Sequence, residues 1–385
     1  MVVRAHAERA KGMPVRLRVI VYRMLIGWLA LLALSWPLIT VAEPAIVEVY
    51  ESVSTAVRGG AVPRQFDESG IVHVGSARIG SMITSPFYVV HYGLRYTHDL
   101  YGERPGWIQD PVLSDWPYPP PKALINIASI VNVADWVCRQ ARTDRVAQGN
   151  THLYYEFAWH YRNIDPDHLT PPWWSGLTDA IAIEFLMRAH DLTGKGEYKD
   201  LAAQLYRSTL QSVESGGSTV YAKGSPVYIE EYVDPSGRVR SGVLNGALCA
   251  GMYIWNYERR MGIAGGVGLA LCRSALAGLH RYDLGNGRWS YYDEVGTIAN
   301  LKYQRINAAM VAWVGGDLDD GVAMALAEKW RSSTVNPILR AVWQRHFSPY
   351  YLCVALAWVL LPAVLVIGST IVIRSCRHYF VAVGE

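Results

Sequence analysis

The spacing of apolar residues along the chain changes near residue 123. Before that point, short apolar runs such as residues 87–90 alternate with glycine and proline, which is typical of an irregular, β-leaning region. After it, the apolar residues of segment 124–141 recur with helical spacing. We therefore predict a short β-rich part over residues 44–122 and a helical domain over residues 123–345.

Further helical segments follow, separated by short, glycine-rich links. They cover residues 177–192, 198–213, 244–260, 268–281, 301–313 and 321–330. The first is apolar on almost every side, so other elements should bury it, and its polar residues Asp179 and Glu184 need partners or a cavity. Neighbouring helices joined in this way predict a mostly α fold, an (α/α) barrel or toroid.

Two small β-like inserts interrupt the helices, at residues 228–246 and 282–293. In the first, Glu230, Glu231 and Tyr232 follow a β-prone run and precede a Pro-Ser-Gly turn. The second carries an Asn-Gly hairpin signal. Acid and phenol groups in a strand-to-helix loop are placed where functional groups often lie, although on composition alone solvated loop acids are the favoured explanation. We expect the two inserts to line one end of the toroid.

Two apolar segments without charged residues lie near the ends of the chain, at residues 24–42 and 348–373. The first follows a basic stretch, which predicts a basic tail and an N-terminal membrane helix, or a cleaved signal segment, over residues 1–43. The second is long enough to be a C-terminal transmembrane helix. Membrane helices are thus expected to flank the fold and to hold the main domain outside the cytoplasm.

Composition narrows the choice of partners and cofactors. The formal net charge of +3 comes largely from the N-terminal tail and indicates no nucleic-acid partner. Tyrosine and tryptophan number 24 and 14 against 6 phenylalanines, and aromatic rings with a polar handle suit sugars. No histidine pair has metal-ligand spacing, and no phosphate loop or dinucleotide fingerprint occurs, so we expect neither a metal nor a cofactor. The cysteine spacing gives no disulfide framework, although a single disulfide stays open.

A series of short motifs gives a more specific indication. In chain order they are Trp174-Ser175-Gly176-Leu177, Leu186-x-Arg188-Ala189-His190-x-Leu192-Thr193-Gly194, Glu230-Glu231-Tyr232, Val243-Leu244-Asn245-Gly246, Tyr282-Asp283 with Tyr292-Asp293, and Tyr303 with Ile306-Asn307. Over residues 125–315 this order resembles the C-terminal domain of the D-glucuronyl C5-epimerases, which act on heparan-type polysaccharides. Each motif is short, and it is their shared order that makes the resemblance specific.

The resemblance implies an (α/α) barrel with a β-rich N-terminal part and a tyrosine-based site. Tyr232, Tyr292 and Tyr303 fall on three tyrosines with catalytic roles in that family. The sequence departs from the family at Val295, which occupies an arginine position, and at Gln304, where a histidine follows the tyrosine.

C5 epimerisation of a uronate removes a proton next to a carboxylate and returns one from the opposite face. A tyrosine is a workable acid, and Glu231 can act as the base if burial raises its pKa. Arg305 or Arg288 can replace the missing arginine as a carboxylate partner, since a guanidinium binds carboxylates in a bidentate manner. The remaining candidates for substrate binding are Glu230, Asn245, Trp174 and Asp179.

These points together predict a carbohydrate isomerase, a racemase or epimerase similar to heparosan-N-sulfate-glucuronate 5-epimerase. Its partners would be an extracytoplasmic acidic polysaccharide and the membrane, with a homodimer left open. Two alternatives keep the fold: a polysaccharide lyase, or a glycoside hydrolase in which Glu231 works with Asp179 or Asp293. A third is a non-catalytic glycan-binding subunit of a polysaccharide assembly system.

Overall fold

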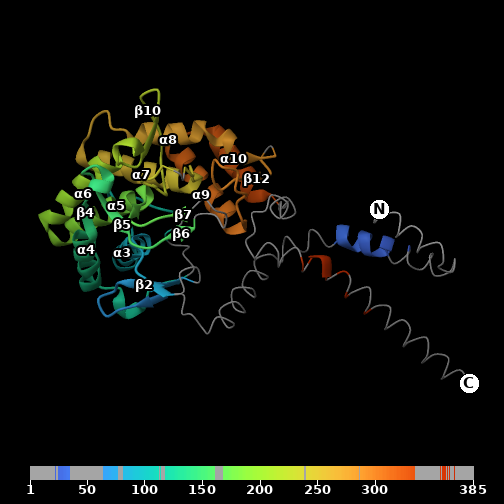
Figure 1. Ribbon diagram of the computed structural model, residues 1–385, viewed down its shortest axis with the longest axis horizontal. Helices are drawn as coiled ribbons and strands as arrows, with labels where there is room; N and C mark the ends of the chain where they lie inside the picture. Colours follow the sequence, from blue (N-terminus) through green and yellow to red (C-terminus); the bar gives the residue numbers. More distant parts are fainter. Residues whose placement is uncertain are drawn as a thin grey trace, which may run out of the picture. The chain divides into compact units, whose positions relative to one another are not determined.

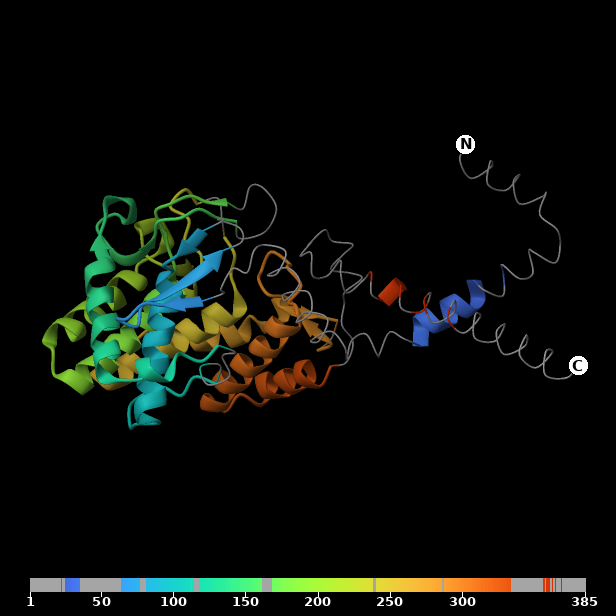
Figure 2. The same ribbon diagram turned by 90° about the horizontal axis from the view of Figure 1, so that it is seen from below.

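The computed structural model divides the chain into two compact units, residues 55–333 and a unit made of residues 1–54 and 334–385. The described residues are 22, 25–34, 64–76, 81–111, 113, 118–160, 168–237, 240–285, 287–333, 356, 358–360, 362, 364 and 368. Figure 1 and Figure 2 show the main unit, in which helices are the dominant element and short strands lie between them.

The described α-helices of the main unit form four pairs, each made of two helices that follow one another in the chain. The pairs are α3 (Pro86–Tyr101) with α4 (Ile127–Gln140), α5 (Gly176–Thr193) with α6 (Gly196–Thr209), α7 (Leu244–Met261) with α8 (Gly268–Ala277), and α9 (Leu301–Asp317) with α10 (Gly321–Ser332). The first helices pack in sequence, α3 on α5, α5 on α7 and α7 on α9. They form an inner row with their partners beside it, which is consistent with a toroid-like helical fold.

All the strand pairings between named strands are antiparallel, and the sheets are small. Three-stranded sheets are formed by β1 (Arg64–Phe66), β2 (Val72–Ser76) and β3 (Ser81–Ile83), and by β4 (Ala141–Thr143), β5 (Thr151–Tyr155) and β8 (Trp173–Trp174). Two-stranded sheets are formed by β6 (Trp159–His160) with β7 (His168–Leu169), β9 (Thr219–Ala222) with β10 (Ser225–Ile229), and β11 (Asp283–Leu284) with β12 (Trp289–Ser290). The β11–β12 sheet lies in the predicted hairpin insert at residues 282–293. The β9–β10 hairpin mostly precedes the predicted insert at residues 228–246, of which only Tyr228 and Ile229 lie in β10.

The prediction of a β-leaning part over residues 44–122 is wrong for segment 87–90, which lies in helix α3. Proline at the first helical position favours this helix start, and the residues buried along it recur with helical period, as Val89, Val90 and Leu94 show. The four-residue apolar run is too short to reveal that period. Gly93 is required by close packing, since a Cβ there would come within 2.7 Å of the Phe185 ring on α5.

No helix in the described part of the chain is long and apolar enough to cross a membrane. Only part of each predicted span, residues 24–42 and 348–373, is described. Within the second unit, Trp358 Nε1 donates a hydrogen bond to the Leu32 carbonyl at 3.0 Å. The three cysteines of the described residues, Cys138, Cys249 and Cys272, are free thiols.

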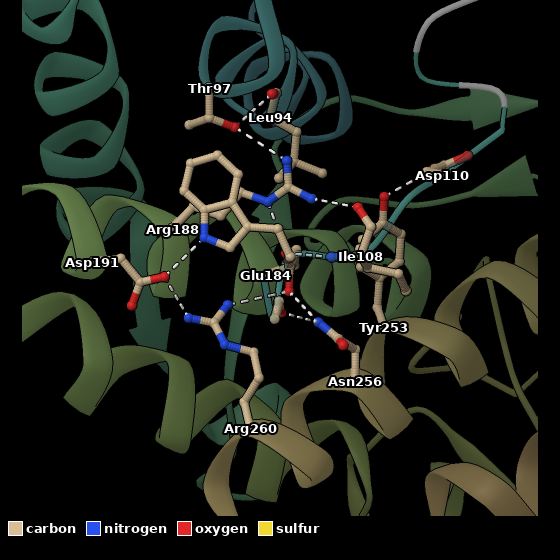
Figure 3. Close-up of polar contacts among 12 residues, drawn as sticks. Leu94, Thr97, Ile108, Asp110, Glu184, Arg188, Asp191, Tyr253, Asn256 and Arg260 are labelled. Atoms are coloured by element: carbon tan, nitrogen blue, oxygen red, sulfur yellow. Dashed lines mark hydrogen bonds and ion pairs between the residues drawn. The ribbon is translucent and has the colours of Figure 1, made fainter. Parts of the chain in front are cut away.

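Helix α5 is the most deeply buried helix, and its polar residues have partners as expected. The Arg188 side chain is 2% exposed and donates from Nε to Glu184 at 2.7 Å. It also donates from Nη2 to the Ile108 carbonyl at 2.7 Å and from Nη1 to Thr97 at 3.3 Å (Figure 3). One guanidinium therefore ties α5 to α3 and to the loop that follows α3.

Glu184 extends this network to α7. Its Oε2 atom accepts from Asn256 at 2.9 Å and lies 3.5 Å from Arg260, which also pairs with Asp191 at 2.7 Å. In the same loop as Ile108, Asp110 accepts a hydrogen bond from the Tyr253 hydroxyl at 2.9 Å (Figure 3). The loop between α3 and α4 is thereby fixed against α5 and α7.

We expect Arg188→Met to lower the free energy of unfolding by about 3–5 kcal/mol, because it removes the nearer of the two cations that pair with the buried Glu184 carboxylate. Urea denaturation of the variant and the wild type measures the change. Arg331→Met is the matched control, since its pair with Glu328 is exposed and should contribute about 0–1 kcal/mol. Equal losses in the two variants would contradict the account.

Candidate active site

A cavity of about 460 Å³ lies at the N-terminal ends of the inner helices. Phe87, Leu177, Asn245 and Lys302 line it, and each is the second residue of its helix, in α3, α5, α7 and α9 respectively. The N-terminus of a helix carries a partial positive charge and unpaired backbone N–H groups. Four such ends directed at one cavity favour an anionic ligand.

The cavity wall is rich in aromatic side chains. They are Phe87, Tyr88, Tyr155, Phe157, Trp159, Trp173, Tyr232 and Tyr303. Trp173 stacks on Tyr155 with ring centroids 3.9 Å apart, which fixes its orientation. Flat apolar surfaces edged by hydroxyl groups suit a ligand with one apolar face and several hydroxyls, as a sugar ring has.

Tyr232 and Tyr303 line this cavity, and Tyr292 contacts both of them without being one of the lining residues. The hydroxyl oxygens of Tyr232 and Tyr292 are 3.4 Å apart, and the rings of Tyr292 and Tyr303 have centroids 4.6 Å apart. Backbone hydrogen bonds from Leu244 to Tyr292 and from Tyr292 to Thr297 hold the second insert in place. Burial, together with the neighbouring acid, raises the pKa of Tyr232 well above 10, so its hydroxyl is protonated at neutral pH.

Glu231 lines the cavity beside Tyr232. Burial raises its pKa to about 8, with a smaller contribution from the Glu230 charge, while a hydrogen bond with Tyr232 acts in the opposite direction. Its Oε2 atom is buried and has no hydrogen-bond partner. Gly246 leaves room for this carboxyl group, because a Cβ atom there would overlap Oε2. Glu231 can therefore exchange a proton near neutral pH.

Glu230 has a different environment from its neighbour and does not line the cavity. It is fully buried and accepts backbone hydrogen bonds from Ser241 at 3.1 Å and Gly242 at 3.3 Å, and another from the Ser241 hydroxyl. These bonds close the loop between β10 and α7. The prediction that Glu230 contacts substrate is not supported by this placement, in which Glu230 stabilises the loop that presents Glu231.

Asp179 and Trp174 also lie away from the cavity lining. Asp179 is fully buried, 2.7 Å from His152 Nδ1, and accepts from the Leu153 backbone at 3.1 Å. Trp174 stacks on His152 with centroids 4.8 Å apart. Side chains alternate along a strand, so the neighbouring Trp173 faces the cavity in place of Trp174.

The two predicted arginines lie outside the cavity lining as well. Arg288 and Arg305 are exposed, and Val295 is 43% exposed. Arg305 follows Tyr303 by two residues, which is about 200° around a helix, so it points away from the face that Tyr303 presents. Lys302 is the lysine that lines the cavity.

Asn245, a predicted substrate-binding residue, lines the cavity. Its side-chain amide donates to Asn307 at 3.2 Å, and Asn307 donates to the Tyr291 carbonyl at 3.1 Å. Asn245 thus links α7 to α9 and to the second insert at the cavity wall.

Several lining residues were not among the predicted site residues, including His91, Asp110, Cys249 and Lys302. Burial first, and then the charges of nearby Arg64, Arg95 and Lys302, lower the pKa of His91 to about 3, so its imidazole is neutral. The helical period of α3 is the signal that could have placed His91 on a buried face. Among the described residues, no group of three or more histidine, cysteine or acidic side chains is arranged to hold a metal ion.

Residues 148–332 match the model of the family described as D-glucuronyl C5-epimerase C-terminus. The matched segment is a little under half of the chain and is similar to that family, although divergent from it. The match confirms the resemblance that the motif order indicated. It begins just before β5 and ends with α10, so helices α3 and α4 lie outside it.

Two further comparisons give more distant similarities. An uncharacterized protein of Methanocaldococcus jannaschii is 27% identical over 179 residues, which cover 45% of this chain and 56% of the relative. The chain thus spans little more than half the length of that relative. A crystal structure of D-mannose isomerase is similar with a TM-score of 0.42 and 12% identity, covering 77% of this chain and 73% of that one. At that distance no functional conclusion rests on it.

We predict that Glu231→Gln changes stability in a pH-dependent way. The folded-state pKa of about 8 lies above the ordinary 4.5, so ionisation of Glu231 destabilises the fold as pH rises from 4.5 through 8. The melting temperature of the variant relative to wild type should therefore rise between pH 5 and pH 9. Glu68→Gln, at an exposed position, should show no such trend. A pH-independent difference for Glu231→Gln would contradict the assignment.

Proposed function

We propose that this protein epimerises C5 of uronate residues in an extracytoplasmic acidic polysaccharide, a reaction of the D-glucuronate to L-iduronate type. The observation that carries the proposal is that Glu231 and Tyr232 line one cavity bordered by four helix N-termini, with the Tyr292 hydroxyl 3.4 Å from that of Tyr232. The family match supports the same class of carbohydrate epimerase. Anchoring at a membrane is part of the proposal through the two apolar segments near the chain ends.

The proposed reaction has two proton transfers. The ionised Glu231 carboxylate takes the C5 proton, and the electron pair left behind delocalises into the adjacent uronate carboxylate. The positive ends of the inner helices stabilise the added negative charge. The Tyr232 hydroxyl returns a proton to C5 from the opposite face, and the Tyr292 hydroxyl, 3.4 Å away, shares the charge left on the phenolate.

The alternative reactions make different demands on the same cavity. A lyase needs the same proton abstraction but then expels the 4-linked sugar and leaves a double bond. A hydrolase needs two carboxyl groups at the cavity, and Asp179 and Asp293 are both fully buried outside its lining. The acids that line the cavity in the described residues are Glu231 and Asp110. A non-catalytic glycan-binding role keeps the cavity and predicts no reaction.

The proposal is tested by solvent-proton exchange at C5. The purified full chain is incubated with heparosan oligosaccharides in deuterated water, and NMR detects deuterium at C5. Tyr232→Phe, Tyr292→Phe and Glu231→Gln should each lower the exchange rate by about 10²–10⁴-fold, the usual contribution of a proton-transfer group. Tyr221→Phe, whose hydroxyl binds the Leu210 carbonyl at an exposed position, should exchange at the wild-type rate.

Each outcome of that experiment separates the alternatives. Deuterium at C5 with inverted configuration and intact chains supports the epimerase. A 4,5-double bond identifies a lyase, and shortened chains without one identify a hydrolase. Retained oligosaccharide binding with no exchange would contradict the proposal and support a binding subunit.

The pH dependence gives a second test. If Glu231 is the base in the free enzyme, kcat/KM should rise about tenfold per pH unit below its pKa of about 8 and level off above it. The profile is measured from the initial rate of C5 exchange between pH 5 and pH 9.5. A profile that falls with rising pH through this range would contradict the base role of Glu231.

A further inference from the structure

Lys302 occupies an unusual place for a lysine. It is the second residue of α9, where the helix end is itself positive and a cation is disfavoured. Its side chain nevertheless lines the cavity, with Nζ 5.5 Å from the centroid of the Tyr303 ring, and its charge helps to lower the pKa of His91 on the cavity wall. The cavity wall therefore carries a lysine beside a positive helix end, a combination that favours an anionic ligand.

The position of Lys302 also fits the chemistry that the cavity requires. A uronate carboxylate is bonded directly to C5, so the group that binds it has to lie next to the groups that handle the C5 proton. Lys302 directly precedes Tyr303, and the ring of Tyr303 packs on the ring of Tyr292. The Tyr292 hydroxyl in turn lies 3.4 Å from the Tyr232 hydroxyl. Arg288 and Arg305 do not line the cavity.

We propose that Lys302 binds the carboxylate of the uronate and gives the cavity its preference for acidic over neutral sugars. This inference rests on the proposed function for the class of ligand, a polysaccharide of uronate residues. In this chain Val295 occupies the position of the family's arginine, and the inference assigns carboxylate binding to Lys302 of α9 instead. The lysine ammonium is a compact charge. It can neutralise the carboxylate without the two parallel hydrogen bonds that an arginine guanidinium would donate.

The alternative is that Lys302 is a solvated helix charge with no ligand. That reading predicts no difference between acidic and neutral sugars when the lysine is replaced. Arg305 provides the matched comparison, because it carries the same charge on the same helix but lies outside the cavity. Any effect of net charge alone would appear equally in variants at either position.

The test is equilibrium binding of a heparosan hexasaccharide and of the same hexasaccharide with its carboxyl groups reduced, measured by calorimetry on the full chain. We expect Lys302→Met to weaken binding of the acidic probe at least tenfold and to leave binding of the reduced probe unchanged. Lys302→Arg should retain most of the affinity for the acidic probe. Arg305→Met should bind both probes like the wild type.

The inference is overturned if Lys302→Met binds the acidic probe as the wild type does, if it weakens both probes equally, or if the wild type binds no acidic probe. Parallel C5 exchange separates this result from the proposed function. Exchange that persists at the wild-type rate in Lys302→Met keeps the epimerase and removes the role of Lys302. Acid-selective binding that needs Lys302, without any exchange, keeps its role and removes the epimerase.

Discussion

The burial of helix α5 from Gly176 to Ala189 is the constraint on which the rest of the main unit depends. A helix surrounded by protein has to satisfy each polar side chain internally, and α5 carries Asp179, Glu184 and Arg188. Asp179 pairs with His152 of β5, while Arg188 binds Glu184, Thr97 of α3 and the carbonyl of Ile108. These bonds fix the neighbouring helices and the loop that carries Asp110. The convergence of the inner helix N-termini at the cavity follows from that packing.

Burial also gives the adjacent residues Glu230 and Glu231 different roles. Glu230 is surrounded by backbone donors of Ser241 and Gly242, so its charge stabilises a loop. Glu231 faces the cavity with one oxygen unpartnered, and burial moves its pKa to about 8. A carboxyl group in this state, beside a protonated Tyr232, forms an acid–base pair suited to proton transfer at carbon.

Helical period and motif order predicted much of this arrangement. The apolar segments with helical period predicted the helices from α4 onward within a few residues, and the motif order brought Tyr232, Tyr292 and Tyr303 into one neighbourhood. Helix α3 was missed because its apolar run is short. The side-chain directions at Trp173 and Trp174, and at Lys302 and Arg305, depend on strand alternation and helix rotation. Moving one residue along a strand, or two or three along a helix, turns a side chain to another face. The resemblance alone therefore could not decide whether Trp173 or Trp174, and Lys302 or Arg305, lines the cavity.

The central claim is that the cavity at the inner helix ends holds a uronate with C5 between Glu231 and the tyrosine hydroxyls. A crystal structure of the Glu231→Gln variant with a bound heparosan tetrasaccharide tests it most directly. The account predicts a sugar stacked against the aromatic wall, with C5 between the side chain of residue 231 and the Tyr232 hydroxyl and its carboxylate toward Lys302. A sugar bound outside this cavity, or one whose C5 faces away from both Tyr232 and residue 231, would contradict it.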